Sequence, residues 1–592
     1  MPELAERAAH AVRLGAEELF GRQRDNGAFG DDPPPSVLGT AGAITALWYA
    51  DRANSAELIA GGSRWLRSVQ QPDGGWGGVL GAASEPVATS VAAATLQIVD
   101  AEDSAEAIAA GRARLEQFGG IAAVTDPAVL LLCKTFYLLA GFLQPSDLRR
   151  LPLEIVLLDK VRRQRISFRT APFAALALAQ SVTHPAGGLR GRTQRLARGR
   201  ALKLLREIYE HEGRTGDFSE DPWPAALVCL SLARAGLAPD MVAASAGYLR
   251  RSVRADGSWD AVSNLDLTRS GYAVTGLLAA GYAGDPRLEQ ARQLFTRCQQ
   301  QQEFTVLACP PGGWSFSGAR GWPVTLESAE IVAALAGLPG ADADPVLRTG
   351  VEWLRGRQDS RGSWSLWVRD TKLANDGPCP SITSQAVIAL LEAGQPADGP
   401  EVSRAVEWLL SQQRPDGTFD NLWYRDYTTG TAAVLAALAR AGRGGDPVAG
   451  PVVDRARQWL SDTQRSDGSW GDGADSESSV EETAWALHAL LEAGSEPDSD
   501  PVRRAVSWLV DAQLPTGGWQ PSRICAYIRH HMYYPNGAIT RGLTLRALGL
   551  YLSRATGSGH HAGTAGTTTT SSEAVPSSAS PASTAASEES GR

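Results

Sequence analysis

Short apolar segments with helical spacing recur along the chain, and polar turns separate them. Segments 405–411 and 505–511 precede such turns, and segments 431–439 and 483–491 follow them. Their apolar residues follow the period of one buried helix face. The alternation of apolar and polar residues that is typical of strands is scarce. The pattern therefore predicts an all-α protein.

The turns share one motif, Gln-x-x-Asp-Gly-x-aromatic, which recurs with variations. Its copies span 23–29, 71–76, 254–259, 358–364, 413–419, 464–470 and 513–519. Aspartate and glycine suit the turn, while the glutamine amide and the indole can bind the end of a neighbouring helix. Because helical hairpins cannot bury their faces singly, we expect them to pack in series. The repeated tryptophans are accordingly expected to hold the fold together.

Composition is that of an ordinary soluble protein. Of 592 residues, 43% are hydrophobic, and no uninterrupted apolar run approaches the roughly 20 residues of a membrane span. The net charge of -9 argues against nucleic acid as the main partner. Six scattered cysteines without CxxC spacing favour reduced thiols and a cytoplasmic location. Residues 557–592 are rich in Gly, Ser, Thr, Ala and Pro, which predicts a disordered tail.

A turn rich in glycine and aromatic residues leads into an apolar helical segment at 309–336. It contains Trp314, Phe316 and Trp322, and Glu327 lies in the first turn of the predicted helix. A carboxyl group among aromatic faces suits chemistry on an apolar, cationic intermediate, because ring faces attract cations. A glutamate near a helix N-terminus also suits the helix dipole without any chemistry. Both interpretations of Glu327 stay open at this point.

Several longer motifs accompany the turns. They are Gly119-Gly-Ile, Thr135-Phe-Tyr, Leu153-Glu-Ile, Pro310-Pro-Gly-Gly-Trp-Ser-Phe316, Tyr427-Thr-Thr-Gly-Thr431 and Glu482-Thr-Ala-Trp-Ala-Leu487. With the order and number of turns, they make the chain resemble the squalene-hopene and oxidosqualene cyclase family of class II terpene cyclases. The resemblance runs from about residue 14 to residue 551.

This resemblance implies two α/α-barrel domains built from helical hairpins. One domain is inserted over about 21–261, and the other joins 1–20 to 262–556. A large apolar cavity would lie between them. In such enzymes a protonated carboxylic acid attacks an alkene or epoxide of a polyprenyl chain, and aromatic faces stabilise the migrating cation.

The run that corresponds to the acidic motif of the family departs from it. Hopene-forming members carry Asp-x-Asp-Asp before Thr-Ala, and oxidosqualene cyclases carry Asp-Cys-Thr-Ala-Glu, whereas this chain has Val324-Thr-Leu-Glu-Ser-Ala-Glu330. By this resemblance Leu326 replaces the proton-donating aspartate, and Glu327 is left as the candidate acid. Thr463 stands where hopene cyclases often place an assisting histidine. A buried, unaided glutamic acid is weak, so it suits an epoxide or activated polyene better than an ordinary alkene.

Aromatic residues at junctions between loops and helices are candidates to line the cavity and contact the substrate. They are Trp223, Trp314, Phe316, Trp322, Trp367, Trp423 and Tyr427, of which the resemblance favours Phe316 and Tyr427. Tyr533 and Tyr534 correspond to a tyrosine-rich cavity segment of the family. Each ring would equally suit a hydrophobic core.

The polar loop 369–379 contains Asp370, Lys372, Asn375 and Asp376. It is expected to be solvated, with a diphosphate site as the alternative. Protonation needs no metal, so no cofactor is expected. A diphosphate substrate would bring in Mg²⁺, although the sequence has no Asp-Asp-x-x-Asp cluster.

The expected function is class II-type cyclisation of a linear isoprenoid, namely a polyprenyl, an epoxy-polyprenyl or a prenyl diphosphate, by an isomerase or lyase. One alternative is an enzyme of this fold with a diphosphate-dependent trigger. Another is a non-catalytic protein that binds a prenyl lipid. Peripheral contact with the cytoplasmic membrane would suit so apolar a substrate, and no motif indicates an oligomeric state.

Overall fold

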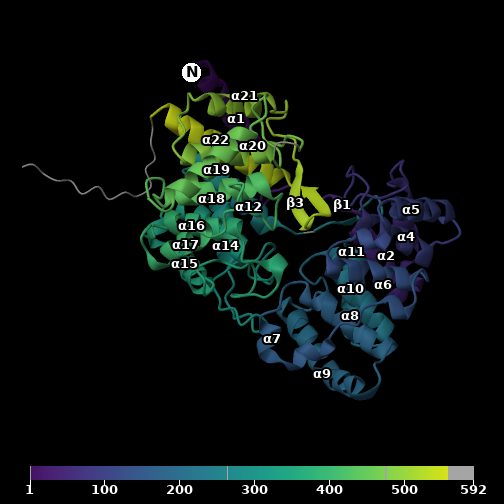
Figure 1. Cartoon of the computed structure of the whole chain (residues 1–592). Coiled ribbons are helices and arrows are strands. Elements are labelled where there is room, and N and C mark those ends of the chain that lie inside the picture. Colours follow the sequence, from purple (N-terminus) through teal and green to yellow (C-terminus); the bar gives the residue numbers. More distant parts are fainter. Residues whose placement is uncertain (1, 263, 474–475, 558–592) are drawn as a thin grey trace, which may run out of the picture.

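The structure, a computed structural model, describes residues 2–262, 264–473 and 476–557. These residues form two helical lobes (Figure 1). The C lobe consists of α1 and α12–α22, and the N lobe consists of α2–α11. The predicted all-α class is confirmed. The predicted tail lies outside the described residues from 558 on, and the expected domain boundaries stay a prediction.

The C lobe is a closed α/α barrel. Its inner ring is α12 (Asp266–Ala279), α14 (Thr325–Ala336), α16 (Pro380–Glu392), α18 (Tyr427–Arg440), α20 (Val480–Glu492) and α22 (Gly537–Ala555). Each inner helix packs on the next, and α22 closes the ring against α12. Its outer layer is α13 (Leu288–Cys298), α15 (Pro345–Arg357), α17 (Pro400–Leu410), α19 (Gly450–Thr463), α21 (Asp500–Asp511) and α1 (Pro2–Phe20).

The inner and outer helices differ in sequence because they differ in how much of their surface is buried. Inner helices such as α14 are buried on nearly every side, and small and apolar residues fill them. Outer helices such as α21 bury one apolar stripe and expose charged residues on the other face. A close contact in the ring depends on glycine, because the backbones of α12 and α22 touch at Gly276 and Gly542.

The N lobe also has an inner and an outer layer of helices. Its inner helices are α2 (Val37–Asp51), α4 (Pro86–Val99), α6 (Pro127–Leu139), α8 (Thr170–Thr183) and α10 (Pro222–Ala235). Around them lie α3 (Ala56–Ser68), α5 (Ala105–Gln117), α7 (Asp159–Arg163), α9 (Gly188–His211) and α11 (Pro239–Arg251). None of the helices in the described ranges is long and apolar enough to cross a membrane.

Short elements complete the described fold. Two antiparallel pairs are β1 (Pro35–Ser36) with β2 (Trp259–Asp260), and β3 (Arg523–Ile528) with β4 (Met532–Pro535). The 3₁₀ turns are Ala53–Ser55, Gly120–Ala123, Pro145–Asp147, Leu153–Leu157, Ala341–Ala343 and Ala374–Asp376.

Hydrogen bonds from the repeated turns join neighbouring hairpins. The glutamine amide of a turn donates to the glycine carbonyl of its own turn and to a carbonyl of another outer helix, as Gln358 does to Gly362 and Glu401. The indoles of Trp76, Trp259, Trp364, Trp470 and Trp519 each donate to the carbonyl ten residues earlier. In the second copy Gln70, not the predicted Gln71, takes this role, because it stands four residues before Gly74 as in other copies.

We expect Gln464→Ala to lower the free energy of unfolding by about 1–3 kcal/mol, because the carbonyls of Gly468 and Pro501 lose their donor. Urea denaturation followed by circular dichroism measures the change. The matched control is Gln458→Ala on the exposed side of α19, which should change little. Equal effects of the two substitutions would contradict this role of the turn glutamines.

Candidate active site

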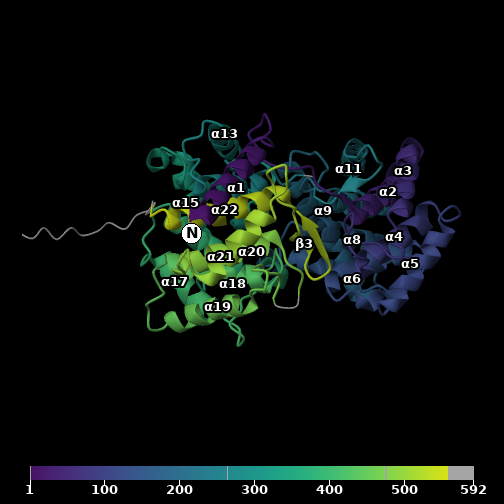
Figure 2. The same ribbon diagram turned by 90° about the horizontal axis from the view of Figure 1, so that it is seen from above.

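The hairpin β3–β4 reaches from the C lobe onto the N lobe (Figure 2). Its Tyr527 hydroxyl donates a 2.8 Å hydrogen bond to Oδ2 of Asp221, at the start of α10. Met532 packs within the hydrophobic core of the N lobe, beside Gly78. The hairpin therefore bridges the two lobes where the resemblance places the substrate cavity.

The polar loop 369–379 is a second contact between the lobes. Asp376 is fully buried and accepts a 2.7 Å hydrogen bond from Arg169 of the N lobe. Asn375 donates to Asp126, the residue that caps α6, at 2.9 Å. The prediction of a solvated loop is wrong for this part of it, because both side chains are used to join the lobes.

Glu327 is the third residue of α14 and is only 7% exposed. Its Oε1 accepts a 2.8 Å hydrogen bond from the hydroxyl of Thr268 on α12. Burial raises the pKa of Glu327 to about 7, although the Thr268 hydrogen bond opposes this shift. A large fraction of the carboxyl group is therefore protonated at neutral pH, as a proton donor must be.

Two tyrosines place hydroxyl groups within electrostatic reach of Glu327. Burial raises the pKa of Tyr424 and of Tyr534 well above the ordinary value, and the charge of Glu327 adds to both shifts. The Tyr424 hydroxyl donates to that of Tyr272 at 2.9 Å. Sequence reasoning missed Thr268 and Tyr424, because neither belongs to a motif.

The Thr463 hydroxyl forms its hydrogen bond within its own helix. It ends α19 in the outer layer, and its hydroxyl donates to the carbonyl of Trp459 at 2.8 Å. Leu326 is buried beside Glu327 in α14. The hydrogen bond to Glu327 thus comes from Thr268 and from neither of the two positions that the resemblance assigns to acid chemistry.

Three predicted aromatic residues gather at the junction of the lobes. Trp367 meets Phe316 and Trp322 edge to face, with ring centroids 6.2 and 6.3 Å apart. The Trp322 indole donates a 2.8 Å hydrogen bond to Glu212 at the end of α9 in the N lobe. This cluster is therefore fixed across the junction.

Trp223 packs within the N lobe, and the hairpin tyrosines lie on the hairpin that bridges the two lobes. Trp223 follows Asp221 at the start of α10 and stacks on Phe136, with 5.5 Å between ring centroids. Tyr534 pairs with Cys525 in the hairpin, and the Tyr533 hydroxyl accepts from the His530 amide at 3.2 Å.

Three other predicted contact residues have different surroundings. Trp314 is fully buried, and its indole donates to the Phe295 carbonyl as the turn tryptophans do. Tyr427 is 39% exposed, with the Arg414 guanidinium 5.1 Å from its ring centroid. Trp423 is half-buried next to β3, where its carbonyl accepts from the backbone of Ala526. Substrate contact by any of the predicted residues stays a prediction.

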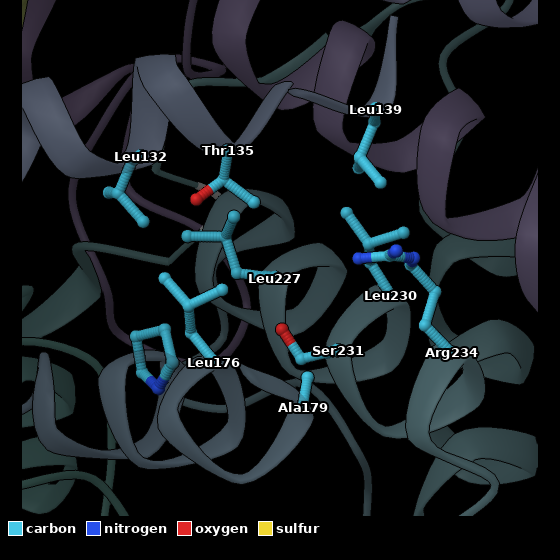
Figure 3. A pocket seen from close by; sticks show the side chains of 10 residues that line it. Leu132, Thr135, Leu139, Leu176, Ala179, Leu227, Leu230, Ser231 and Arg234 are labelled. Carbon is cyan, nitrogen blue, oxygen red and sulfur yellow. The ribbon is translucent and has the colours of Figure 1, made fainter. Parts of the chain in front are cut away.

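Two small pockets lie inside the barrels. One, of about 10 Å³, lies between α6, α8 and α10 (Figure 3). The other, of about 30 Å³, lies between α16, α18, α20 and α22. The second has room for about one or two water molecules. Neither pocket borders Glu327, so the large cavity that the resemblance implies stays a prediction.

Glu212 is a second buried carboxyl group at the junction. Burial, together with the charge of Asp217, raises its pKa to about 8, while the Trp322 indole opposes the shift. The folded chain holds this proton at pH values where the unfolded chain has lost it, between the ordinary pKa of 4.5 and about 8. The contribution of Glu212 to the free energy of unfolding therefore falls as pH rises through that window.

We expect the melting temperature of Glu212→Gln minus that of the wild type to be larger at pH 8 than at pH 5. The amide can still accept from Trp322 but cannot ionise. Thermal melts at the two pH values measure the difference, with Glu210→Gln on the exposed face of α9 as control. A difference that is the same at both pH values would contradict the raised pKa.

Two family models match the chain. The squalene-hopene cyclase N-terminal domain matches residues 12–167, and the C-terminal domain matches residues 309–541. Together they cover about two thirds of the chain. The squalene-hopene cyclase of Bradyrhizobium diazoefficiens is 30% identical over 278 residues, which are 40% of this chain and 41% of that relative. That of Alicyclobacillus acidocaldarius is 29% identical over 357 residues, 55% of this chain and 56% of the relative.

These matches thus span between about two fifths and just over half the length of the curated relatives. Among solved structures, ent-copalyl diphosphate synthase from Streptomyces platensis superposes with a TM-score of 0.53 at 19% identity. The superposition covers 92% of this chain and 99% of that one. At this identity the likeness shows a shared fold.

Proposed function

The chain belongs to the squalene-hopene cyclase family, and on that premise we propose that it cyclises a linear isoprenoid by the acid-initiated, class II route. The observation that supports the proposal most is the environment of Glu327. This carboxyl group is buried, burial raises its pKa to about 7, and its Oε1 accepts a hydrogen bond from Thr268. Glu327 is accordingly the proposed proton donor.

The neutral carboxyl group of Glu327 transfers its proton to the substrate. In an alkene the π electrons form the new C–H bond, and in an epoxide the oxygen takes the proton as its C–O bond breaks. Either step leaves a carbocation that the next double bonds attack in turn. The Thr268 hydroxyl and the N-terminal end of α14 stabilise the glutamate that is left behind.

Aromatic rings at the junction stabilise the moving positive charge. Phe316, Trp322 and Trp367 already pack together there, and Tyr424 and Tyr534 lie within electrostatic reach of Glu327. A cation near a ring face gains about 0.5–2 kcal/mol, and more where water is excluded. The proposed substrate space is therefore the region between the lobes that these rings border.

The proposed reaction needs only the side chains of the protein, with Mg²⁺ reserved for a diphosphate substrate. Purified protein should be incubated with farnesyl and geranylgeranyl diphosphate, squalene and epoxysqualene, with EDTA or Mg²⁺ and with or without liposomes. Mass spectrometry should find a cyclic isomer of at least one substrate in EDTA. Product that requires Mg²⁺ would favour a diphosphate-dependent trigger, and tight lipid retention without product would favour a binding protein.

A further inference from the structure

We infer that the pocket inside the C-lobe barrel is a binding site for about one or two water molecules, which fix the direction of a hydrogen-bonded chain that ends at Tyr424. The pocket has a volume of about 30 Å³ and lies between α16, α18, α20 and α22. A water molecule needs about 10–15 Å³ of such volume, so the size fits. None of the residues that line the pocket has a role in the proposed function.

A buried amide oxygen at this pocket lacks a hydrogen-bond donor. Gln385 lies on α16 and is only 9% exposed. Its Nε2 donates to the Tyr272 hydroxyl at 3.2 Å, whereas its Oε1 has no hydrogen-bond partner among the described residues. Buried polar atoms in folded proteins are nearly always paired, because an unpaired one lowers stability. Since Gln385 lines the pocket, a molecule bound there can supply the missing donor.

Two more polar side chains line the pocket and can form further hydrogen bonds. Nη2 of Arg546 donates to Glu330 at 2.8 Å and to the Thr275 hydroxyl, while its Nε and Nη1 have no acceptor among the described residues. Nε2 of His488 lies 3.6 Å from Oε1 of Glu492, which is too far for a hydrogen bond. Burial lowers the pKa of His488 to about 3, so its ring is neutral and offers one donor and one acceptor.

This mixture of donors and acceptors favours water over an ion. An anion in the pocket would meet the amide oxygen of Gln385, and a cation would meet the guanidinium of Arg546. A water molecule can donate to the first group and accept from the second. Ile388, Leu543 and alanines of α18 and α20 form much of the remaining lining, and they carry no charge that would compensate an ion.

Water in the pocket would decide which way the Gln385 amide points. A water that donates to Oε1 keeps Nε2 directed at the Tyr272 hydroxyl, whereas the reversed amide would turn a donor toward the side that Arg546 lines. The Tyr424 hydroxyl donates to the same Tyr272 oxygen at 2.9 Å. Tyr424 also packs edge to face on Trp485, another lining residue, with 4.9 Å between ring centroids. Tyr424 is therefore held to the pocket wall by a hydrogen-bonded chain and by a ring contact.

A high-resolution crystal structure of the full chain, with and without pressurised xenon, tests the site. A water peak should lie within hydrogen-bond distance of Oε1 of Gln385 and of Arg546. Xenon should not enter the pocket, because it occupies dry, apolar cavities. The N-lobe pocket of about 10 Å³ is the internal control and should hold no ordered water, since none of the unpartnered buried atoms of the described residues lines it. A barrel pocket without water, or one that takes up xenon, would overturn the inference.

Magnetic relaxation dispersion of water counts long-lived internal waters in solution. Gln385→Met should lower that count by about one or two, because methionine keeps the length of the side chain but lacks the amide oxygen. Ile388→Leu is the matched control on the same helix and pocket, and it should leave the count unchanged. An equal count in wild type and Gln385→Met would also overturn the inference. Neither measurement uses a substrate, so failure of the proposed function would leave both results valid.

Discussion

Replacing Glu327 with glutamine should lower the rate of product formation by at least about a hundredfold, the usual contribution of a general acid. The amide has no proton of suitable acidity to transfer, yet it keeps the size of the side chain and an oxygen for the Thr268 hydroxyl. The fold should therefore stay intact. Initial rates of product formation, measured by mass spectrometry at saturating substrate, test this expectation.

Two further measurements make that result specific. Glu352→Gln, on the exposed face of α15, should leave the rate unchanged. The wild-type rate should fall as pH rises through about 7, because the fraction of protonated Glu327 falls there. A Glu327→Gln variant that keeps its rate within a few-fold would refute Glu327 as the acid.

Gly542→Ala should prevent the C lobe from folding or lower its stability by several kcal/mol. An added Cβ at this position would lie 2.2 Å from the carbonyl oxygen of Tyr272 on α12. The obstacle is backbone, so it cannot move away without opening the ring between α12 and α22. Soluble yield and the midpoint of urea denaturation measure the effect.

Gly356→Ala is the matched control for that substitution. Gly356 lies near the end of α15, with no heavy atom within 4 Å of an added Cβ. Alanine should stabilise the helix here by about 0.5–1 kcal/mol, because glycine loses more backbone freedom on folding. Loss of stability in both variants would contradict a specific role for the close contact of α12 and α22.

The repeats made much of the fold predictable from sequence, because their evidence is local. Each turn carries its own glutamine, glycine and aromatic residue, and the bonds of Gln464 and Trp470 repeat those of Gln358 and Trp364. Even so, the motif places the start of the second copy one residue too late. Two adjacent glutamines stand there, and only the spacing to Gly74 distinguishes them.

The site was less predictable, because its contacts join distant segments. Thr268 and Glu327 are 59 residues apart, and Asp221 and Tyr527 are 306 apart. No local pattern marks either pair. Tryptophans are also ambiguous, since Trp314 serves a turn while Trp322, eight residues later, binds the other lobe. Packing of the two lobes, rather than residue type, decides between these roles.

The place of α1 has a consequence for synthesis on the ribosome. This helix packs against α21 and α22, and the Gln513 amide donates to the carbonyl of Ala11, 502 residues earlier. The apolar face of α1 thus leaves the exit tunnel long before the helices that cover it are made. During that time the apolar face of α1 lacks the two helices that cover it in the finished protein. Completion of the C lobe must follow translation of α22.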